Sequence, residues 1–400
     1  MNPYLARLQP YPFERLRALF QGALPPADRR EIKLSIGEPQ HPTPAFIREA
    51  LTGGLDGLAN YPTTQGIPAL RNAIAEWAKT RYGLPALNAE TEILPVNGSR
   101  EALFSFAQAI IDPTKPQPLV VCPNPFYQIY EGAALLGGAE PCFLNTLPEN
   151  DFALDFDSLS ANEWSRVQLF FICSPGNPTG KVYSLEDWKK LFALSDKYGF
   201  VIASDECYSE LYFADNKPLG GLEAAHRLGR GFDRLVMFSS LSKRSNVPGM
   251  RSGFVAGDAA LIKAFLLYRT YHGCAMNPAI QTASVAAWKD EAHVAENRRL
   301  YGEKFATVTP LISGVLETAL PDAGFYLWAR VDRKTGLSDT EFARRLYAAE
   351  NVVVLPGSFL ARESHGINPG AGFVRIALVA GTAECTDAAN RIINFVKSIN

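Results

Sequence analysis

Four short, continuously apolar runs separated by helical patterns constrain the fold of this chain most. The runs are PLVVC at 118–122, LFFIC at 169–173, FVIAS at 200–204 and RLVMFSS at 234–240. Between two of them, SLEDWKKLFALSDKYG at 184–199 has a helix N-cap, helical periodicity and a glycine stop. Continuously apolar strands are typical of sheets covered on both faces, and intervening helices make consecutive strands parallel. The sequence therefore predicts an α/β fold around a mostly parallel central sheet flanked by helices.

A change of pattern near residue 297 predicts a second, smaller α+β unit. The 400 residues are too many for one ordinary core, so two lobes are expected. We expect residues 1–31 to form an N-terminal arm and linker that joins the small domain. Residues 32–296 would form the large domain and residues 297–400 the small C-terminal domain, with the boundary inside one long helix.

The charge balance and the cysteines narrow the functional classes. The net charge of −2 and the 20% charged residues provide no general attraction to nucleic acid or to anionic lipid. The six cysteines are dispersed without CxxC spacing, which favours reduced thiols over disulfides or a metal site. No apolar run has the length of a membrane span. We expect a cytoplasmic protein that binds a small molecule, with neither metal nor membrane contact.

Unusual residues follow each of the four apolar runs. The segments PNPFYQIY and SPGNPTG follow the first two runs, Asp205 and Tyr208 follow the third, and Ser242 and Lys243 follow the fourth. In open parallel sheets, ligands bind beyond the carboxyl ends of the strands. We therefore expect these side chains to meet at one edge of the sheet.

Asp205 and Lys243 each allow a structural and a chemical interpretation. A carboxylate directly after an apolar strand needs a partner. In the structural interpretation, Asp205 caps a helix or forms an ion pair. In the chemical interpretation, it is the partner of a positively charged ring nitrogen. Lys243 is either a surface cation or an amine that forms a Schiff base. Its position near Arg251 in a partly dry pocket would favour loss of its proton.

Ser240, Ser242 and Arg251 are suited to binding a dianion, because a guanidinium group donates paired hydrogen bonds to phosphate oxygens. Gly98 and Ser99 lie at the predicted start of a helix, where free backbone N–H groups bind anions. At Gly98 and Ser99, the alternative to an anion site is the start of an ordinary capped helix.

Three further residues have structural alternatives. Tyr127 is suited to stacking on a planar ring, or it belongs to the core. Asn177 by itself indicates a turn. Arg375 interrupts the apolar run FVRIALVA and requires an anion, either a substrate carboxylate or a structural acid.

A phosphate-binding group, a stacking aromatic ring, a carboxylate, a phenol and a lysine together describe a pyridoxal 5′-phosphate site. The chain resembles the class I aminotransferases of fold type I over essentially its whole length. The matching segments, in order, are SIGEP, YPTTQGIPALR, NGSREAL, PNPFYQIY, SPGNPTG, SDECY, SLSKRSNVPGMRSG, GFYLW and VRIAL. The resemblance implies pyridoxal phosphate as cofactor and a large domain with a mostly parallel sheet plus a smaller α+β domain.

The resemblance also implies a role for each matching position. Lys243 would bind the cofactor covalently and move the substrate proton, Asp205 would keep the ring nitrogen protonated, and Tyr127 would stack on the ring. Asn177 and Tyr208 would hydrogen-bond the ring oxygen. The phosphate would be held by Gly98, Ser99 or Arg100, Ser240, Ser242, Arg251, and Tyr61 of a neighbouring subunit. Arg375 would bind the substrate α-carboxylate beside Ile36 and Gly37.

The same segments are similar to bacterial N-succinyldiaminopimelate aminotransferases of lysine biosynthesis, which implies glutamate and 2-oxoglutarate as partners and a homodimer. A distal carboxylate then requires another cation. The resemblance implies Arg269 from the adjacent subunit, and Arg100 and Arg244 are further candidates; each is otherwise a solvated surface arginine. An aspartate, alanine or aromatic aminotransferase, or a carbon–sulfur lyase, remains the alternative on the same fold. A second alternative is a non-catalytic regulator that keeps the fold and binds the cofactor.

Overall fold

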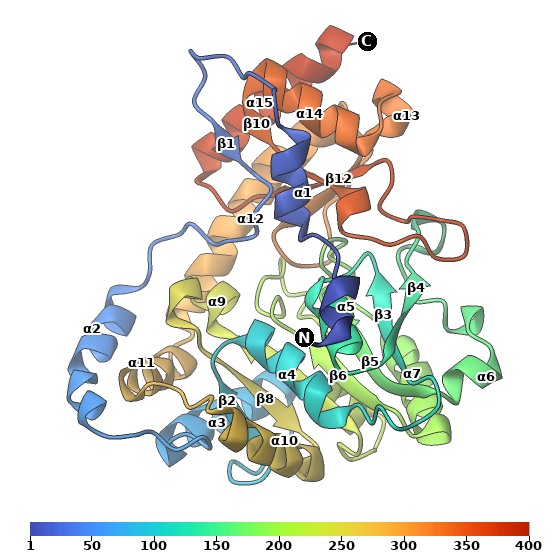
Figure 1. Ribbon diagram of the computed structural model, residues 1–400. Coiled ribbons are helices and arrows are strands. Elements are labelled where there is room, and N and C mark those ends of the chain that lie inside the picture. Colours follow the sequence, from blue (N-terminus) through green and yellow to red (C-terminus); the bar gives the residue numbers. More distant parts are fainter. Residues whose placement is uncertain (400) are drawn as a thin grey trace.

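The computed structural model describes residues 1–399 and contains a seven-stranded sheet with the order β2–β8–β7–β6–β5–β3–β4 (Figure 1). Its strands are β2 (Ile93–Val96), β3 (Leu119–Asn124), β4 (Glu140–Asn145), β5 (Val167–Cys173), β6 (Val201–Asp205), β7 (Leu235–Ser240) and β8 (Gly253–Gly257). The five strands from β7 to β4 pair in parallel, whereas β8 is antiparallel to both neighbours. The mostly parallel sheet predicted from the sequence is confirmed.

Helices cover both faces of this sheet. They are α2 (Ala45–Gly53), α3 (Pro68–Tyr82), α4 (Ser99–Ile110), α5 (Ile129–Leu136), α6 (Ala161–Trp164), α7 (Leu185–Tyr198), α8 (Gly221–Arg227), α10 (Ala259–His272) and α11 (Pro278–Lys289). Phe170 and Phe171 of β5 belong to two different hydrophobic clusters, one on each face. Successive side chains of a strand point to opposite faces, so a strand buried on both sides is continuously apolar. Among residues 1–399, no helix is long and apolar enough to cross a membrane.

Helix α7 illustrates how local sequence sets an element. The Ser184 hydroxyl accepts a hydrogen bond from the Asp187 N–H, and the Asp187 carboxylate accepts one from the Ser184 N–H. Gly199 ends the helix with φ 82°, a left-handed conformation that glycine adopts without steric cost. The buried face of α7 carries Trp188, Leu191 and Phe192, so the 184–199 pattern defines a helix whose place against the sheet is fixed by its apolar side.

The C-terminal elements surround a separate three-stranded antiparallel sheet with the order β11–β12–β9. These strands are β9 (Tyr326–Arg330), β11 (Leu355–Pro356) and β12 (Phe373–Ala377), and the helices are α13 (Asp332–Thr335), α14 (Asp339–Glu350) and α15 (Thr382–Ile399). The long helix α12 (Ala292–Ser313) runs from the side of the large sheet to the C-terminal elements (Figure 1).

The segment at 32–34 lies with the C-terminal elements. Strand β1 (Ile32–Lys33) pairs in parallel with β10 (Val352–Val353), and the Ala377 N–H donates to the Leu34 carbonyl. Ile32 and Leu34 are buried in the C-terminal hydrophobic cluster. The expected start of the large domain at residue 32 therefore needs correction, because this segment completes the smaller core.

The N-terminal arm contacts both parts of the molecule. Arg7, in the 3₁₀ helix η1 (Pro3–Arg7), forms an ion pair with Glu140 at the edge of the large sheet. Helix α1 (Pro12–Leu19) buries Leu16 in a cluster with Trp328 and Phe359. The chain between η1 and α1 consequently passes close to the carboxyl ends of the large sheet (Figure 1).

Candidate active site

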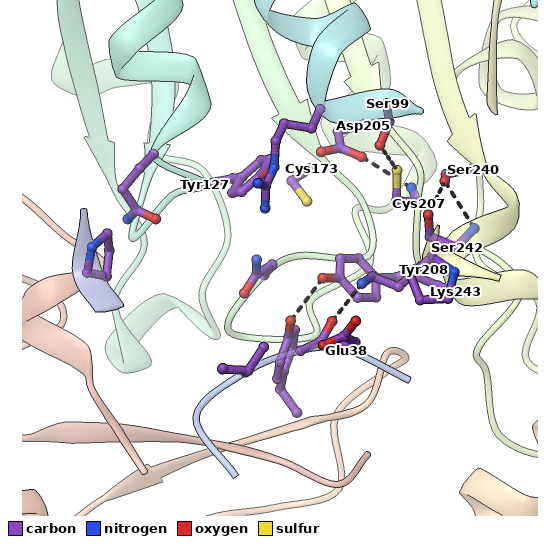
Figure 2. Close-up of a pocket in the computed structure, with 18 of the residues that line it drawn as sticks. Glu38, Ser99, Tyr127, Cys173, Asp205, Cys207, Tyr208, Ser240, Ser242 and Lys243 are labelled. Carbon is purple, nitrogen blue, oxygen red and sulfur yellow. Dashed lines mark hydrogen bonds between the residues drawn. The ribbon is translucent and has the colours of Figure 1, made fainter. Parts of the chain in front are cut away.

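A cavity of about 480 Å³ lies where the strand ends of the large sheet face the C-terminal elements (Figure 2). The predicted site residues that line it are Ile36, Gly37, Ser99, Arg100, Tyr127, Asn177, Asp205, Tyr208, Ser240, Ser242, Lys243, Arg251 and Arg375. They come from seven of the segments named above. The edge predicted from the strand ends is thus a single pocket.

Sequence reasoning missed several residues of this cavity. They are Tyr11, Pro12, Phe13, Glu38, Gln128, Cys173, Cys207, Pro248, Gly249, Tyr326 and Leu360. Two of them had a usable signal: Cys207 stands between Asp205 and Tyr208 in SDECY, and Tyr326 is the central residue of GFYLW. Nothing in the local sequence of the arm indicates that Tyr11 reaches the pocket.

Lys243 lies on the short helix α9 (Leu241–Arg244), for which the Ser240 hydroxyl is the N-cap. Its Nζ donates a 2.6 Å hydrogen bond to the Gly37 carbonyl. Burial, with smaller contributions from the positive charges of Arg375 and Arg100, lowers the pKa of Lys243 to about 8, although Cys207 and Glu38 oppose the shift. The sequence predicted that Arg251 would lower the pKa of this amine, but the arginines that contribute are Arg375 and Arg100. An amine with this pKa is neutral in a useful fraction near pH 7, as a nucleophile requires.

Asp205 ends β6 and is 4% exposed. Its Oδ2 accepts a 2.7 Å hydrogen bond from the Tyr130 hydroxyl, and its Oδ1 accepts one of 3.2 Å from the Cys207 N–H. Burial raises the pKa of Asp205, whereas the hydrogen bond from Tyr130 opposes the rise. A cation placed against this carboxylate would favour its ionised form, so the site is suited to a protonated ring nitrogen.

Two phenols meet at the side of the pocket closest to Lys243. The hydroxyls of Tyr208 and Tyr326 lie 3.0 Å apart, and both side chains are buried. Tyr326 approaches the backbone at Gly37 so closely that a Cβ there would overlap its hydroxyl. A side chain at position 37 would therefore displace Tyr326 from Tyr208.

Hydroxyl and guanidinium groups gather below the start of α4. The Ser240 hydroxyl donates to the Ser242 hydroxyl at 2.9 Å, and the Cys207 thiol donates to the Ser99 hydroxyl at 2.9 Å. Gly98 has φ 87°, and a Cβ at this position would overlap the Arg251 guanidinium. This set of donors around a helix start is suited to a phosphate dianion.

Arg375 is buried on β12 without an acidic partner in its hydrogen bonds. Its Nη1 donates to the Asn177 side-chain oxygen at 2.9 Å and its Nη2 donates to the Ser35 carbonyl at 2.7 Å. Its Nε has no hydrogen-bond partner among residues 1–399. A buried guanidinium with an unused donor is suited to a carboxylate ligand.

Four candidate residues lie outside the cavity lining: Gly98, which directly precedes the lining residue Ser99, and Tyr61, Arg269 and Arg244. Tyr61 is fully exposed. Arg269 is buried in an ion pair with Glu101 and also donates to the Cys274 carbonyl, so within this chain it does not reach the pocket. Arg244 is buried in an ion pair with Glu291. Among the three candidates for a distal carboxylate, only Arg100 lines the cavity.

The model of the family "Aminotransferase class I and II" matches residues 29–392. The chain belongs to this family. The match covers the cavity lining except for the three residues of the arm, Tyr11, Pro12 and Phe13. Its members are pyridoxal-phosphate-dependent enzymes that transfer amino groups between amino acids and 2-oxo acids, and this chain has their fold type I architecture.

Similar proteins support the same family. An aminotransferase structure from Neisseria meningitidis is 55% identical, with a TM-score of 0.95 and coverage of 98% of this chain and 99% of that one. An LL-diaminopimelate aminotransferase of Maridesulfovibrio salexigens is 32% identical over 97% of both chains. A Thermus thermophilus structure described as a "probable N-succinyldiaminopimelate aminotransferase" is 26% identical, with a TM-score of 0.83 and coverage of 96% and 100%.

The pocket fits the cofactor of this aminotransferase family. The side chains provide a buried carboxylate at one end, a hydroxyl-rich anion site next to a helix start, and an amine with a lowered pKa. The absence of a side chain at Gly98 lets the Arg251 guanidinium lie against the start of α4, because a Cβ there would overlap it. These groups match the ring nitrogen, the phosphate and the aldehyde of pyridoxal phosphate, in that order.

Proposed function

We propose that this aminotransferase uses glutamate to aminate the 2-oxo acid precursor of N-succinyl-LL-2,6-diaminopimelate, in a ping-pong reaction of lysine biosynthesis. The observation that carries the proposal is that Arg375 and Arg100 line the cavity in addition to Arg251, which belongs to the proposed phosphate site. Glutamate, 2-oxoglutarate and the succinylated substrate each carry a carboxylate at the reacting carbon and at least one distant carboxylate. The diaminopimelate aminotransferases among the relatives also support this substrate class.

We assign each predicted site residue a role in this reaction. Pyridoxal phosphate, when bound, supplies an electron sink for the pair of electrons left at the substrate Cα. Lys243 would hold the cofactor through its aldehyde, and its Nζ would carry the proton of the substrate Cα. Asp205 holds a proton at the ring nitrogen, and Tyr208 with Asn177 hydrogen-bonds the ring oxygen. Tyr127 stacks on the ring.

The remaining residues orient the phosphate and the substrate. Arg375 binds the α-carboxylate through the Nε that has no partner among residues 1–399, and Ile36 with Gly37 lines that end of the pocket. The phosphate ligands are Gly98, Ser99, Ser240, Ser242, Arg251 and, from the partner subunit of a homodimer, the exposed residue Tyr61.

We assign Arg100 as the residue that binds the distal carboxylate. Its Nε donates to the Tyr127 hydroxyl at 2.5 Å, which directs the guanidinium along the pocket wall. Arg100 is exposed and forms no ion pair with an acidic residue among residues 1–399. A guanidinium group that has no acidic partner is available to bind a substrate carboxylate.

The substrate assay tests the proposal directly. Purified protein with pyridoxal phosphate, glutamate and N-succinyl-2-amino-6-oxopimelate should release 2-oxoglutarate, with a kcat/KM at least about tenfold above that for alanine or for cystathionine cleavage. Equal or better rates with alanine, an aromatic amino acid or cystathionine would contradict it. LL-Diaminopimelate, as amino donor to 2-oxoglutarate, belongs in the same assay because several relatives are LL-diaminopimelate aminotransferases.

Replacing Arg100 should lower kcat/KM far more for acidic substrates than for neutral ones. In Arg100→Gln, we expect kcat/KM for glutamate to fall by about 30- to 1000-fold, because the distal carboxylate loses a charge-assisted hydrogen bond of about 2–4 kcal/mol. The kcat/KM for alanine, which has no distal carboxylate, should change less than threefold, which corresponds to about 0.6 kcal/mol. A parallel loss for both donors would assign Arg100 to cofactor binding instead. Arg17→Gln, on the surface of α1, is the control.

We also propose that the large domain and the small C-terminal domain function as two units joined by α12, with the boundary near residue 297. Residues 1–34 then belong to the small unit, in line with the pairing of β1 with β10.

A further inference from the structure

Asn297 is a buried residue of α12 whose side chain contacts the lysine loop. It is 2% exposed. Its Nδ2 donates to the Lys243 carbonyl at 3.1 Å and to the Arg244 carbonyl at 3.4 Å. The helix that connects the two parts of the molecule is thus hydrogen-bonded to the backbone of the residue that carries the reactive amine.

The other half of the same amide contacts two more segments. Asn297 Oδ1 accepts a hydrogen bond of 2.8 Å from His41 Nδ1 and one of 3.1 Å from Asn246 Nδ2. An amide side chain has two N–H donors and two oxygen lone pairs, so Asn297 uses its full capacity. The His41 ring also packs on Tyr301, one turn further along α12, with the ring centroids 4.7 Å apart.

The segment that contains His41 begins at the acceptor of the Lys243 amine. Lys243 Nζ donates to Gly37 O, and residues 37–41 connect this carbonyl to the His41 ring. Thr43 further fixes the segment, because its hydroxyl donates to the Asn246 carbonyl at 3.1 Å. The contacts therefore close a ring: Lys243 Nζ, Gly37, His41, Asn297 and the Lys243 carbonyl.

We propose that Asn297 is a positioning residue for Lys243, which holds the lysine backbone directly and the acceptor of its amine through His41. Asn297 touches neither cofactor nor substrate in this account. It reduces the number of places that a long, flexible side chain can occupy, and a reacting group displaced by about 1 Å loses up to about a hundredfold in rate. The effect on Lys243 should exceed any effect on the anion site, because the hydrogen bonds of the Asn297 side chain go to His41, Asn246, Lys243 and Arg244 among residues 1–399 and not to Ser240, Ser242 or Arg251.

Covalent capture of the cofactor tests this proposal apart from turnover. In cofactor-free Asn297→Ala, the rate constant for covalent capture of pyridoxal phosphate should fall by about tenfold or more. Binding of 4-deoxypyridoxine phosphate, which has the ring and the phosphate but no aldehyde, should change less than twofold. His41→Phe retains the ring on Tyr301 and removes only the donor to Asn297; it should slow capture in the same direction by a smaller factor.

In turnover, kcat should fall with little change in KM, and the isotope effect from an α-deuterated donor should rise, because proton transfer by Lys243 becomes slower. Asn351→Gly is the matched control: Asn351 is also buried, donates to the Arg29 carbonyl and has φ 53°, which glycine accepts. Normal capture in both Asn297→Ala and His41→Phe would overturn the proposal. So would a parallel loss of 4-deoxypyridoxine phosphate binding, since that result indicates a merely structural role.

Discussion

Lys243→Ala should lower the rate of amino-group transfer by at least about ten-thousandfold, because it removes both the nucleophile and the proton carrier. The pocket should persist, since among residues 1–399 the Lys243 amine makes a single hydrogen bond, to Gly37 O. The phosphate site should therefore still bind 4-deoxypyridoxine phosphate. The visible absorption band of the covalently bound cofactor should be lost.

Lys304 provides the matched control for Lys243→Ala. Lys304 is 1% exposed, its Nζ donates to the Leu378 and Val379 carbonyls, and burial lowers its pKa to about 8 as well. It lies outside the cavity lining. Lys304→Met should lower the free energy of unfolding and leave the absorption band in place. Normal transamination by Lys243→Ala would refute the mechanism, whatever the control does.

Asp205→Asn should lower kcat/KM by about 30- to 5000-fold, which corresponds to the roughly 2–5 kcal/mol lost when one partner of a buried charge pair is removed. An amide cannot keep the ring nitrogen protonated, so electrons from the substrate Cα are accepted less well. We expect the protein to retain cofactor, because the phosphate ligands and Lys243 are unchanged. Stopped-flow half-reactions with glutamate would place the loss in the proton-transfer step.

Asp339→Asn is the control for Asp205→Asn. Asp339 is 5% exposed, and its carboxylate accepts a hydrogen bond from the Ser358 N–H in the C-terminal part. This variant should lower stability without changing the half-reaction. If Asp205→Asn transferred amino groups at the normal rate, Asp205 would have only the structural role that its hydrogen bond with Tyr130 also allows.

The large sheet and most of the pocket were predictable because they depend on local signals. The apolar runs define strands, and parallel strands place their following residues at one edge, so Asp205, Lys243 and Ser242 were expected to meet. Tyr326 was missed because its role depends on the absence of a side chain at Gly37, some 290 residues away. Tyr11 was missed because only the tertiary anchoring of the arm brings it to the pocket.

The predicted boundary at residue 32 failed for a similar reason. The pairing of Ile32 with Val352 joins positions 320 residues apart, and no periodicity encodes such a contact. Arg269, expected to bind the distal carboxylate from the adjacent subunit, forms an ion pair with Glu101 of its own chain, a contact that the sequence does not indicate; its role in substrate binding stays a prediction. The hydrogen bonds of Asn297 to Lys243 and His41 were likewise invisible in the sequence, because they join three distant segments.

Borohydride reduction of the holoenzyme followed by peptide mapping tests the central claim most directly. The account predicts one pyridoxyl group per chain, attached to Nζ of Lys243. Lys304, which is buried and has a similarly lowered pKa, should remain unlabelled. A label on any other lysine, or an unlabelled Lys243 in protein that retains its cofactor, would contradict the account.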